Sequence, residues 1–272
     1  MESRIAQSLS FKYGPIAVLL TNEKPAGARQ FKDGKVGCVM FMLGAAARGH
    51  EAVFDRKTFG CFGGGVGLGF GNQYRNFPGG EACFHHFLSV GNETWETGRQ
   101  VSEQLKPFLP EAFYDDLWHG ERYLKTPEAV KRFVEQLPMT DIPFEYVVFK
   151  PLKDVPDSET PEVVVFLTDL DQLAALVVLA NYEAPHNENV FIPFAAGCQS
   201  IGIYPFREAK SDQPRAVVGQ VDISARLALK RQLKDDLMTF AIPFQLFRTM
   251  EANVPGSFLE RHTWQELVKL KE

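Results

Sequence analysis

Short apolar runs alternate along the chain with longer segments in which apolar residues recur at helical spacing. The runs at residues 15–21, 144–149 and 162–168 are rich in β-branched residues and predict buried strands. The same patterns predict helices at 36–50, 80–90, 169–182, 227–240 and 262–270, and further strands at 51–54, 190–194 and 215–221. Residues 101–136 predict two or three short helices, because prolines interrupt the helical pattern. This alternation predicts an α/β fold.

A short internal similarity predicts two related halves. Residues 16–22 resemble residues 163–169, and a Gly-Cys pair follows each run, at Gly37-Cys38 and at Gly197-Cys198. We therefore expect an N-terminal half at 1–140 and a C-terminal half at 141–272, each a small mixed sheet with covering helices. The two halves would place Cys38 and Cys198 at equivalent positions, and they can also pack as one compact domain.

Residues 60–71 contain seven glycines and predict a loop, because glycine loses the most backbone freedom when it is ordered. The segment has neither the Gly-Lys-Ser/Thr ending of a P-loop nor the dinucleotide-binding fingerprint. Two interpretations stay open: a nest of backbone N–H groups that holds an anion or a cluster, and a loop packed under aromatic side chains. The candidate cofactor-binding residues are Gly60, Gly63, Gly64 and Gly65, with Arg75 as the nearest cation.

The four cysteines are the strongest candidates for chemistry. Cys38, Cys61 and Cys198 directly follow glycine, and Cys38, Cys83 and Cys198 fall near predicted helix starts. A helix start lowers the pKa of a thiol, as metal ligation and nucleophilic attack both require. We therefore predict a cysteine-ligated iron–sulfur cluster, of the four-iron kind, with these four residues as ligands. The alternative is that they are buried as small apolar residues, whereas a zinc site that adds His85 and His86 is less favoured.

Composition and charge limit the possible partners. The chain has 272 residues, is 45% hydrophobic and 23% charged, and carries a formal net charge of −5. An acidic chain without a dense basic run is not expected to bind nucleic acid. Residues 1–12 lack the apolar stretch of a secretory signal, and the apolar run at 173–180 is too short to cross a membrane. We expect a cytoplasmic protein without a membrane partner, whose cysteines are thiols or ligands rather than disulfides.

The chain resembles the uncharacterised "domain of unknown function 169" family. The resemblance rests on the Gly-Cys and glycine-rich segments and on the later apolar strand, at residues 15–18, 37–40, 45–49, 60–65, 67–69, 161–166 and 197–198. It implies a cytoplasmic prokaryotic protein, frequently from anaerobes, with no assigned reaction. Cys38 and Cys61 match the family's characteristic cysteines. Oxygen-sensitive cofactors suit such hosts, so the resemblance also favours the iron–sulfur interpretation.

Three functional hypotheses follow. The first is an iron–sulfur protein with a redox or ligand-binding role, which would work with a redox partner. The second is a non-catalytic module that holds a small apolar or tetrapyrrole-like molecule in a cleft between the halves, lined by some of the 23 phenylalanines. The third is a cysteine-dependent enzyme with Cys61 or Cys38 as the nucleophile. The substrate stays open, and so do enzymatic activity and assembly into a homo-oligomer.

Overall fold

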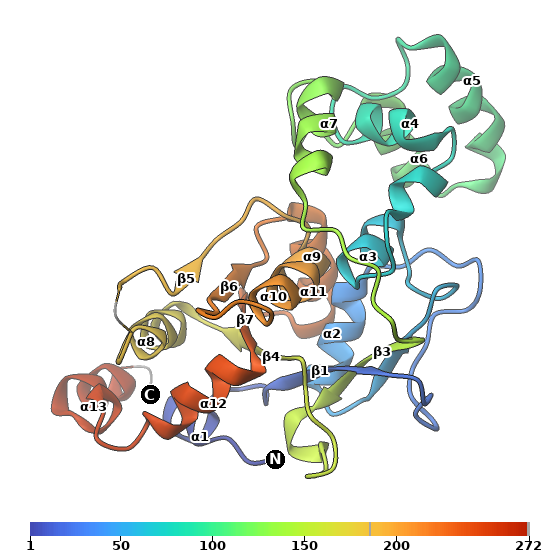
Figure 1. Cartoon of the computed structure of the whole chain (residues 1–272). Coiled ribbons are helices and arrows are strands. Elements are labelled where there is room, and N and C mark those ends of the chain that lie inside the picture. Colours follow the sequence, from blue (N-terminus) through green and yellow to red (C-terminus); the bar gives the residue numbers. More distant parts are fainter. Residues whose placement is uncertain (185, 271–272) are drawn as a thin grey trace. The chain divides into compact units, whose positions relative to one another are not determined.

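The computed structural model, which describes residues 1–184 and 186–270, contains a seven-stranded mixed sheet with the order β2-β3-β1-β4-β7-β6-β5 (Figure 1). The strands are β1 (Ile16–Thr21), β2 (Ala52–Phe54), β3 (Tyr146–Pro151), β4 (Val163–Thr168), β5 (Val190–Phe191), β6 (Ala216–Gly219) and β7 (Met238–Pro243). Neighbouring strands are antiparallel, except that β5 and β6 pair in parallel. The predicted α/β class is confirmed.

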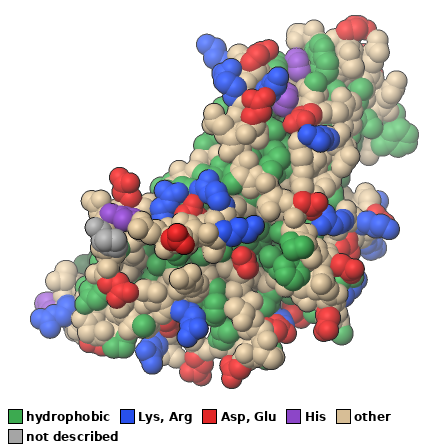
Figure 2. Space-filling view, in the orientation of Figure 1, with side chains coloured by type: hydrophobic (Ala, Val, Ile, Leu, Met, Phe, Trp, Pro, Cys, Tyr) green, Lys and Arg blue, Asp and Glu red, His purple; other side chains and the backbone are tan. Residues whose placement is uncertain are grey.

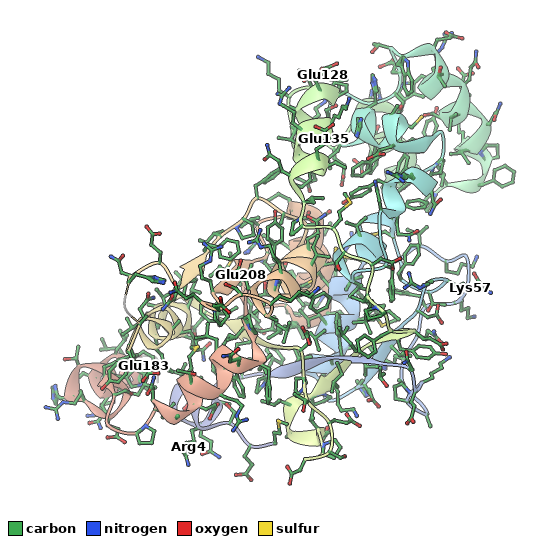
Figure 3. All side chains as sticks on the ribbon, in the orientation of Figure 1. Arg4, Lys57, Glu128, Glu135, Glu183 and Glu208 are labelled. Atoms are coloured by element: carbon green, nitrogen blue, oxygen red, sulfur yellow. The ribbon has the colours of Figure 1, made fainter. Side chains whose placement is uncertain are left out.

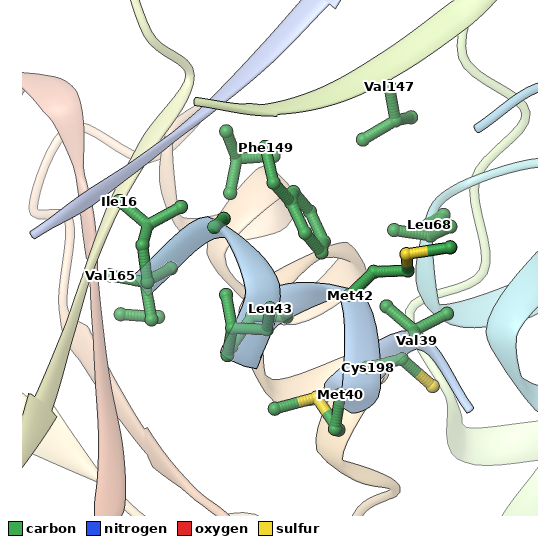
Figure 4. Close-up of a cluster of buried hydrophobic side chains, with 14 of the residues drawn as sticks. Ile16, Val39, Met40, Met42, Leu43, Leu68, Val147, Phe149, Val165 and Cys198 are labelled. Carbon is green, nitrogen blue, oxygen red and sulfur yellow. The ribbon is translucent and has the colours of Figure 1, made fainter. Parts of the chain in front are cut away.

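Consecutive residues of the central strands enter two different cores, one on each face of the sheet. In β4, Val163 and Val165 belong to the first core, while Val164 and Phe166 belong to the second. Successive side chains of a strand point to opposite faces, so an uninterrupted apolar run requires cover on both. Figure 4 shows part of the first core, in which Leu43 of a covering helix lies near Val165.

Helices cover both faces. The first core includes residues of α2 (Val39–Ala47), α9 (Gly197–Ile201), α10 (Ile203–Glu208) and α11 (Ile223–Leu233). The second core includes residues of α1 (Arg4–Leu9), α8 (Leu170–Ala180), α12 (Phe244–Ala252) and α13 (His262–Lys269), with short helical turns at η3 (Leu152–Asp154) and η4 (Phe258–Glu260). Of the two aspartates at the start of this helix, Asp169 is the N-cap of α8 and forms a reciprocal capping box with Gln172. Among the described residues, no helix is both long enough and apolar enough to cross a membrane.

The chain divides into two compact units. Unit 1 contains Met1–Phe70 and the described residues from Asp141 onward, which include the whole sheet, whereas unit 2 is Gly71–Thr140. Unit 2 consists of η1 (Gln73–Asn76), α4 (Gly80–Phe87), α5 (Glu96–Leu105), η2 (Lys106–Phe108), α6 (Glu111–His119) and α7 (Pro127–Gln136). Aromatic side chains form its interior, as in the stacked rings of Tyr74 and Phe84, whose centroids are 3.9 Å apart.

The chain leaves unit 1 and returns to it at adjacent points. Phe70 and Asp141 form an isolated antiparallel bridge, and the N–H of Gly71 donates to the carbonyl oxygen of Thr140 at 3.0 Å. Unit 2 is therefore an insertion whose two ends are tied together.

Two predicted features differ from the structure. The halves at 1–140 and 141–272 are not confirmed, because β1 and β2 from the first half join strands of the second half in one sheet. The helix predicted at 227–240 ends at Leu233, and β7 begins at Met238. That strand pairs with β4 along six residues, so tertiary pairing determines its conformation.

The loop predicted at 60–71 is wrong in its central part, where the structure has helix α3 (Phe62–Gly67). Glycine is a poor helix former, but it lets two backbones approach more closely than any other residue. A β-carbon added to Gly67 would lie 2.7 Å from the carbonyl carbon of Cys198 in α9. Close packing of α3 against α9 therefore explains glycines that helix propensity alone disfavours.

Candidate functional site

Three of the four cysteines lie at the beginnings of helices in unit 1. Cys38 is the N-cap residue of α2, Cys61 is the N-cap residue of α3, and Cys198 is the second residue of α9. The predicted position of Cys38 and Cys198 near helix starts is confirmed. Cys83 is the fourth residue of α4 in unit 2, where it is buried. We name Cys38, Cys61 and Cys198 the thiol cluster.

Glycines bring the segments before Cys38 and Cys61 into direct contact. A β-carbon added to Gly60 would lie 2.4 Å from the carbonyl oxygen of Gly37, closer than any real β-carbon contact. Added β-carbons at Gly37 and Gly60 would also both meet the ring of Phe31, at 2.3 Å and 2.9 Å. The residues that precede these two cysteines therefore lie against each other and against one aromatic ring.

One peptide group connects the sulfurs of Cys61 and Cys198. The thiol of Cys198 donates a hydrogen bond to the carbonyl oxygen of Gly63 at 3.1 Å. The sulfur of Cys61 accepts a hydrogen bond from the N–H of Gly64 at 3.2 Å. Since this oxygen and this nitrogen belong to the same peptide unit and point in opposite directions, the two sulfurs lie on opposite sides of that peptide unit.

Burial keeps two thiols of the cluster protonated. Burial and then the neighbouring charge of Cys61 raise the pKa of Cys38 from 9.0 to about 12, against a smaller opposing effect of the Met40 N–H. Burial, followed by the charges of Cys61 and Cys38, raises the pKa of Cys198 well above 9.0. The predicted lowering of these pKa values is therefore wrong, because loss of hydration outweighs the helix N-termini.

The iron–sulfur prediction is wrong. Among residues 1–184 and 186–270, no group of three or more His, Cys, Asp or Glu side chains is placed to hold a metal. The proposed ligand Cys83 is buried in α4, where its sulfur packs against Gly79. Within unit 1, the sulfurs of Cys61 and Cys198 are directed to backbone groups of α3 rather than to a common point. These sulfurs therefore do not point toward one shared position, as ligands of a single metal site must.

The other predicted binding residues have different surroundings. Gly60 adopts a left-handed backbone conformation, with φ of +85° directly before Cys61, which glycine adopts without strain. Gly63, Gly64 and Gly65 lie in α3, where the Gly63–Gly64 peptide contacts the two sulfurs. Arg75 lies in η1 of unit 2. A cofactor-binding role for these residues stays a prediction.

Unit 1 also contains a polar hollow that the sequence reasoning missed. It has a volume of about 470 Å³ and is lined by His186, Glu188, Arg207, Glu208, Ser211, Gln213 and Arg215. We name these residues the arginine pocket. No motif marks them, because they come from the segment before β5, the end of α10 and the turn that leads to β6. The one available signal was Glu208, an acidic residue close to the apolar positions Ile203 and Phe206.

The fold and the thiol cluster define an α/β protein that gathers cysteines distant in sequence at the starts of neighbouring helices. The chain belongs to the DUF169 family, described as "Uncharacterised ArCR", whose model matches residues 4–253. The predicted resemblance is therefore confirmed. Comparison with curated proteins gave no match, and comparison with solved structures gave none.

Proposed function

We propose that the thiol cluster is a reversible redox site in which Cys38 and Cys61 form a disulfide upon oxidation. The observation that carries this proposal is the direct contact of Gly37 with Gly60, one residue before each cysteine. A disulfide requires α-carbons about 5.5 Å apart. Backbones in contact at the preceding residues support such a separation at Cys38 and Cys61.

The two cysteines have different surroundings, which supports different roles. Both cysteines are partly exposed, but only the sulfur of Cys61 is described with a hydrogen bond from Gly64, an interaction that favours negative charge on sulfur. Cys61 is therefore the thiol that meets the oxidant. Cys38, whose pKa is about 12, remains a protonated thiol and reacts second, with the oxidised Cys61 beside it.

The chemistry balances with a peroxide as the oxidant. The sulfur of Cys61 attacks the peroxide O–O bond, and its thiol is converted to a sulfenic acid as the first water leaves. The sulfur of Cys38 then attacks the sulfenic sulfur, the S–S bond forms, and the second water leaves with the thiol proton of Cys38. A small dithiol returns both cysteines to the thiol form by thiol–disulfide exchange and becomes a disulfide itself.

Hydrogen peroxide treatment of the reduced full-length protein is expected to join Cys38 and Cys61. Alkylation in denaturant, followed by peptide mass spectrometry before and after a dithiol reductant, measures the cross-link and its reversal. Cys38→Ser should abolish the disulfide and leave the sulfenic acid of Cys61 for a sulfenic-acid reagent to trap. The Cys83→Ser control should cross-link like the wild type, because the proposed disulfide does not include Cys83.

The Cys198→Ser variant tests whether Cys38, rather than Cys198, is the disulfide partner of Cys61. The thiol of Cys198 is directed to the Gly63 carbonyl, so the proposal expects this variant to retain the Cys38–Cys61 cross-link. A dominant disulfide that includes Cys198 would contradict the proposal. Oxidation of Cys61 to higher acids, without a cross-link and at the same rate in the wild type and Cys38→Ser, would do so equally.

A further inference from the structure

The arginine pocket lies in a part of unit 1 where charged side chains gather. Figure 2 shows Lys and Arg side chains grouped over the region of β5 and α10, with acidic side chains between them. Figure 3 labels Glu208 in this region, at the end of α10. The side chain of Glu208 is 5% exposed, whereas those of Arg207 and Arg215 are 44% and 37% exposed. A buried carboxylate thus lies beneath two half-exposed guanidinium groups.

Glu208 holds both guanidinium groups in place. One carboxylate oxygen accepts from Nη2 of Arg207 at 2.6 Å and from Nε at 3.1 Å. The two carboxylate oxygens accept from Nε and Nη2 of Arg215, each at 3.0 Å. Burial alone would raise the pKa of Glu208, but the hydrogen bonds from Arg215 and Arg207 outweigh burial and lower it. Glu208 is therefore a permanent anion at neutral pH.

Aromatic rings support the same guanidinium groups from the side. The guanidinium carbon of Arg215 lies 4.4 Å from the ring centroid of Phe191, and that of Arg207 lies 5.3 Å from the ring centroid of Tyr204. A cation over an aromatic face loses orientational freedom and gains electrostatic attraction. Both arginines are consequently ordered before any ligand arrives, which reduces the entropy lost on binding.

Within residues 1–184 and 186–270, each arginine retains guanidinium donors that Glu208 does not engage. A guanidinium group carries five N–H bonds, and among the described residues Glu208 accepts from two nitrogens of each arginine. At least one terminal nitrogen of each arginine therefore makes no hydrogen bond with Glu208. Planar guanidinium donors match the paired oxygens of a carboxylate or a phosphate.

Charge and volume limit the ligand further. Glu208 and Glu188 balance the formal charges of Arg207 and Arg215, so the pocket does not suit molecules that carry several anionic groups. A volume of about 470 Å³ exceeds what a single oxyanion needs, and Ser211, Gln213 and His186 add neutral polar groups to the lining. These properties fit a small molecule with one anionic group and a hydroxylated body.

We infer that the arginine pocket binds a small hydroxylated organic molecule through its carboxylate or phosphate group, which Arg207 and Arg215 recognise. Glu208 is a positioning residue that holds the two arginines. The inference is independent of the thiol cluster, because the pocket shares no residue with it. The polar lining also makes this pocket unsuited to an apolar or tetrapyrrole-like ligand.

Calorimetric titration of the full-length protein with glycerate and with glycerol 3-phosphate tests the inference and distinguishes the two anionic groups. Glycerol is the uncharged control and is expected not to bind. Arg207→Gln should weaken binding at least about tenfold, because a charge-assisted pair of hydrogen bonds is lost. Arg248→Gln makes the same change of charge at an exposed position of α12 and should leave the affinity unchanged.

Three results would overturn the inference: no saturable binding of either anion, equal binding of glycerol, or equal affinities for Arg207→Gln and the wild type. Arg207→Lys separates geometry from charge, since lysine retains the charge but lacks the planar fork. We expect its affinity to lie between those of the wild type and Arg207→Gln. Thermal unfolding of each variant without ligand verifies that the compared proteins are folded.

Discussion

Replacing Gly202 with alanine is expected to reduce the free energy of unfolding by about 3 kcal/mol or more. Gly202 lies between α9 and α10, and an added β-carbon would be 1.9 Å from the carbonyl oxygen of Gly67 and 3.2 Å from that of Cys198. Both neighbours are backbone atoms, so no side-chain rotation relieves the overlap. Helix α3 must move away from α9 before a methyl group fits.

Urea unfolding of Gly202→Ala and of a matched control measures this cost. Gly14→Ala is the control, because an added β-carbon there meets no atom within 4 Å. The control should unfold at nearly the wild-type urea concentration, whereas Gly202→Ala should unfold at a much lower one. Equal midpoints for the two variants would show that α3 and α9 are not packed as closely as described.

Alkaline conditions are expected to destabilise the wild type more than the Cys38→Ser variant. The pKa of Cys38 is raised from 9.0 to about 12 on folding, so its stabilising contribution is complete below pH 9.0. As the pH rises above 9.0, the unfolded chain releases this proton while the folded protein retains it, and the free energy of unfolding falls until about pH 12. At a pH of about 10.5, the difference should be about 2 kcal/mol.

The measurement compares how far the free energy of unfolding falls between neutral and high pH in the wild type and in Cys38→Ser. Denaturant unfolding at neutral pH gives the effect of Cys38→Ser itself, and the additional loss at high pH is then compared between the two proteins. Tyr13 and Tyr204, whose pKa values are raised chiefly by burial, also titrate at high pH but are present in both proteins. Parallel stability–pH curves for the wild type and the variant would contradict the burial described for Cys38.

Short-range sequence patterns correctly predicted the elements whose conformation depends on neighbouring residues. The capping position of Asp169 and the apolar run of β4 identify α8 and the central strand, because both depend on nearby residues. The glycines of α3 led to the wrong prediction of a loop. They are needed for close contacts with Cys198 and Gly202, which lie far along the chain. β7 was missed for a similar reason, because its partner residues in β4 lie 70 to 80 positions earlier in the chain.

The positions of three cysteines at helix starts or directly before helices were predictable from their Gly-Cys pairs, but their chemistry was not. Gly-Cys pairs at Cys38, Cys61 and Cys198 indicated turns that meet, and in the structure Cys61 and Cys198 contact one peptide unit while the glycines before Cys38 and Cys61 lie against each other. The protonation of the thiols was not predictable, because it depends on burial by segments that contribute no recognisable motif. The arginine pocket was beyond sequence reasoning, since Glu208 and Arg215 meet only through the turn between α10 and β6.

The hydrogen bond between Gly71 and Thr140, next to the bridge between Phe70 and Asp141, has a consequence for protein engineering. Seventy residues begin and end at nearly the same point, so a tight turn could replace them without lengthening any remaining connection. All seven strands and the thiol cluster belong to the remaining part. This junction is therefore a natural place to trim the chain, or to graft a foreign domain between the two retained segments.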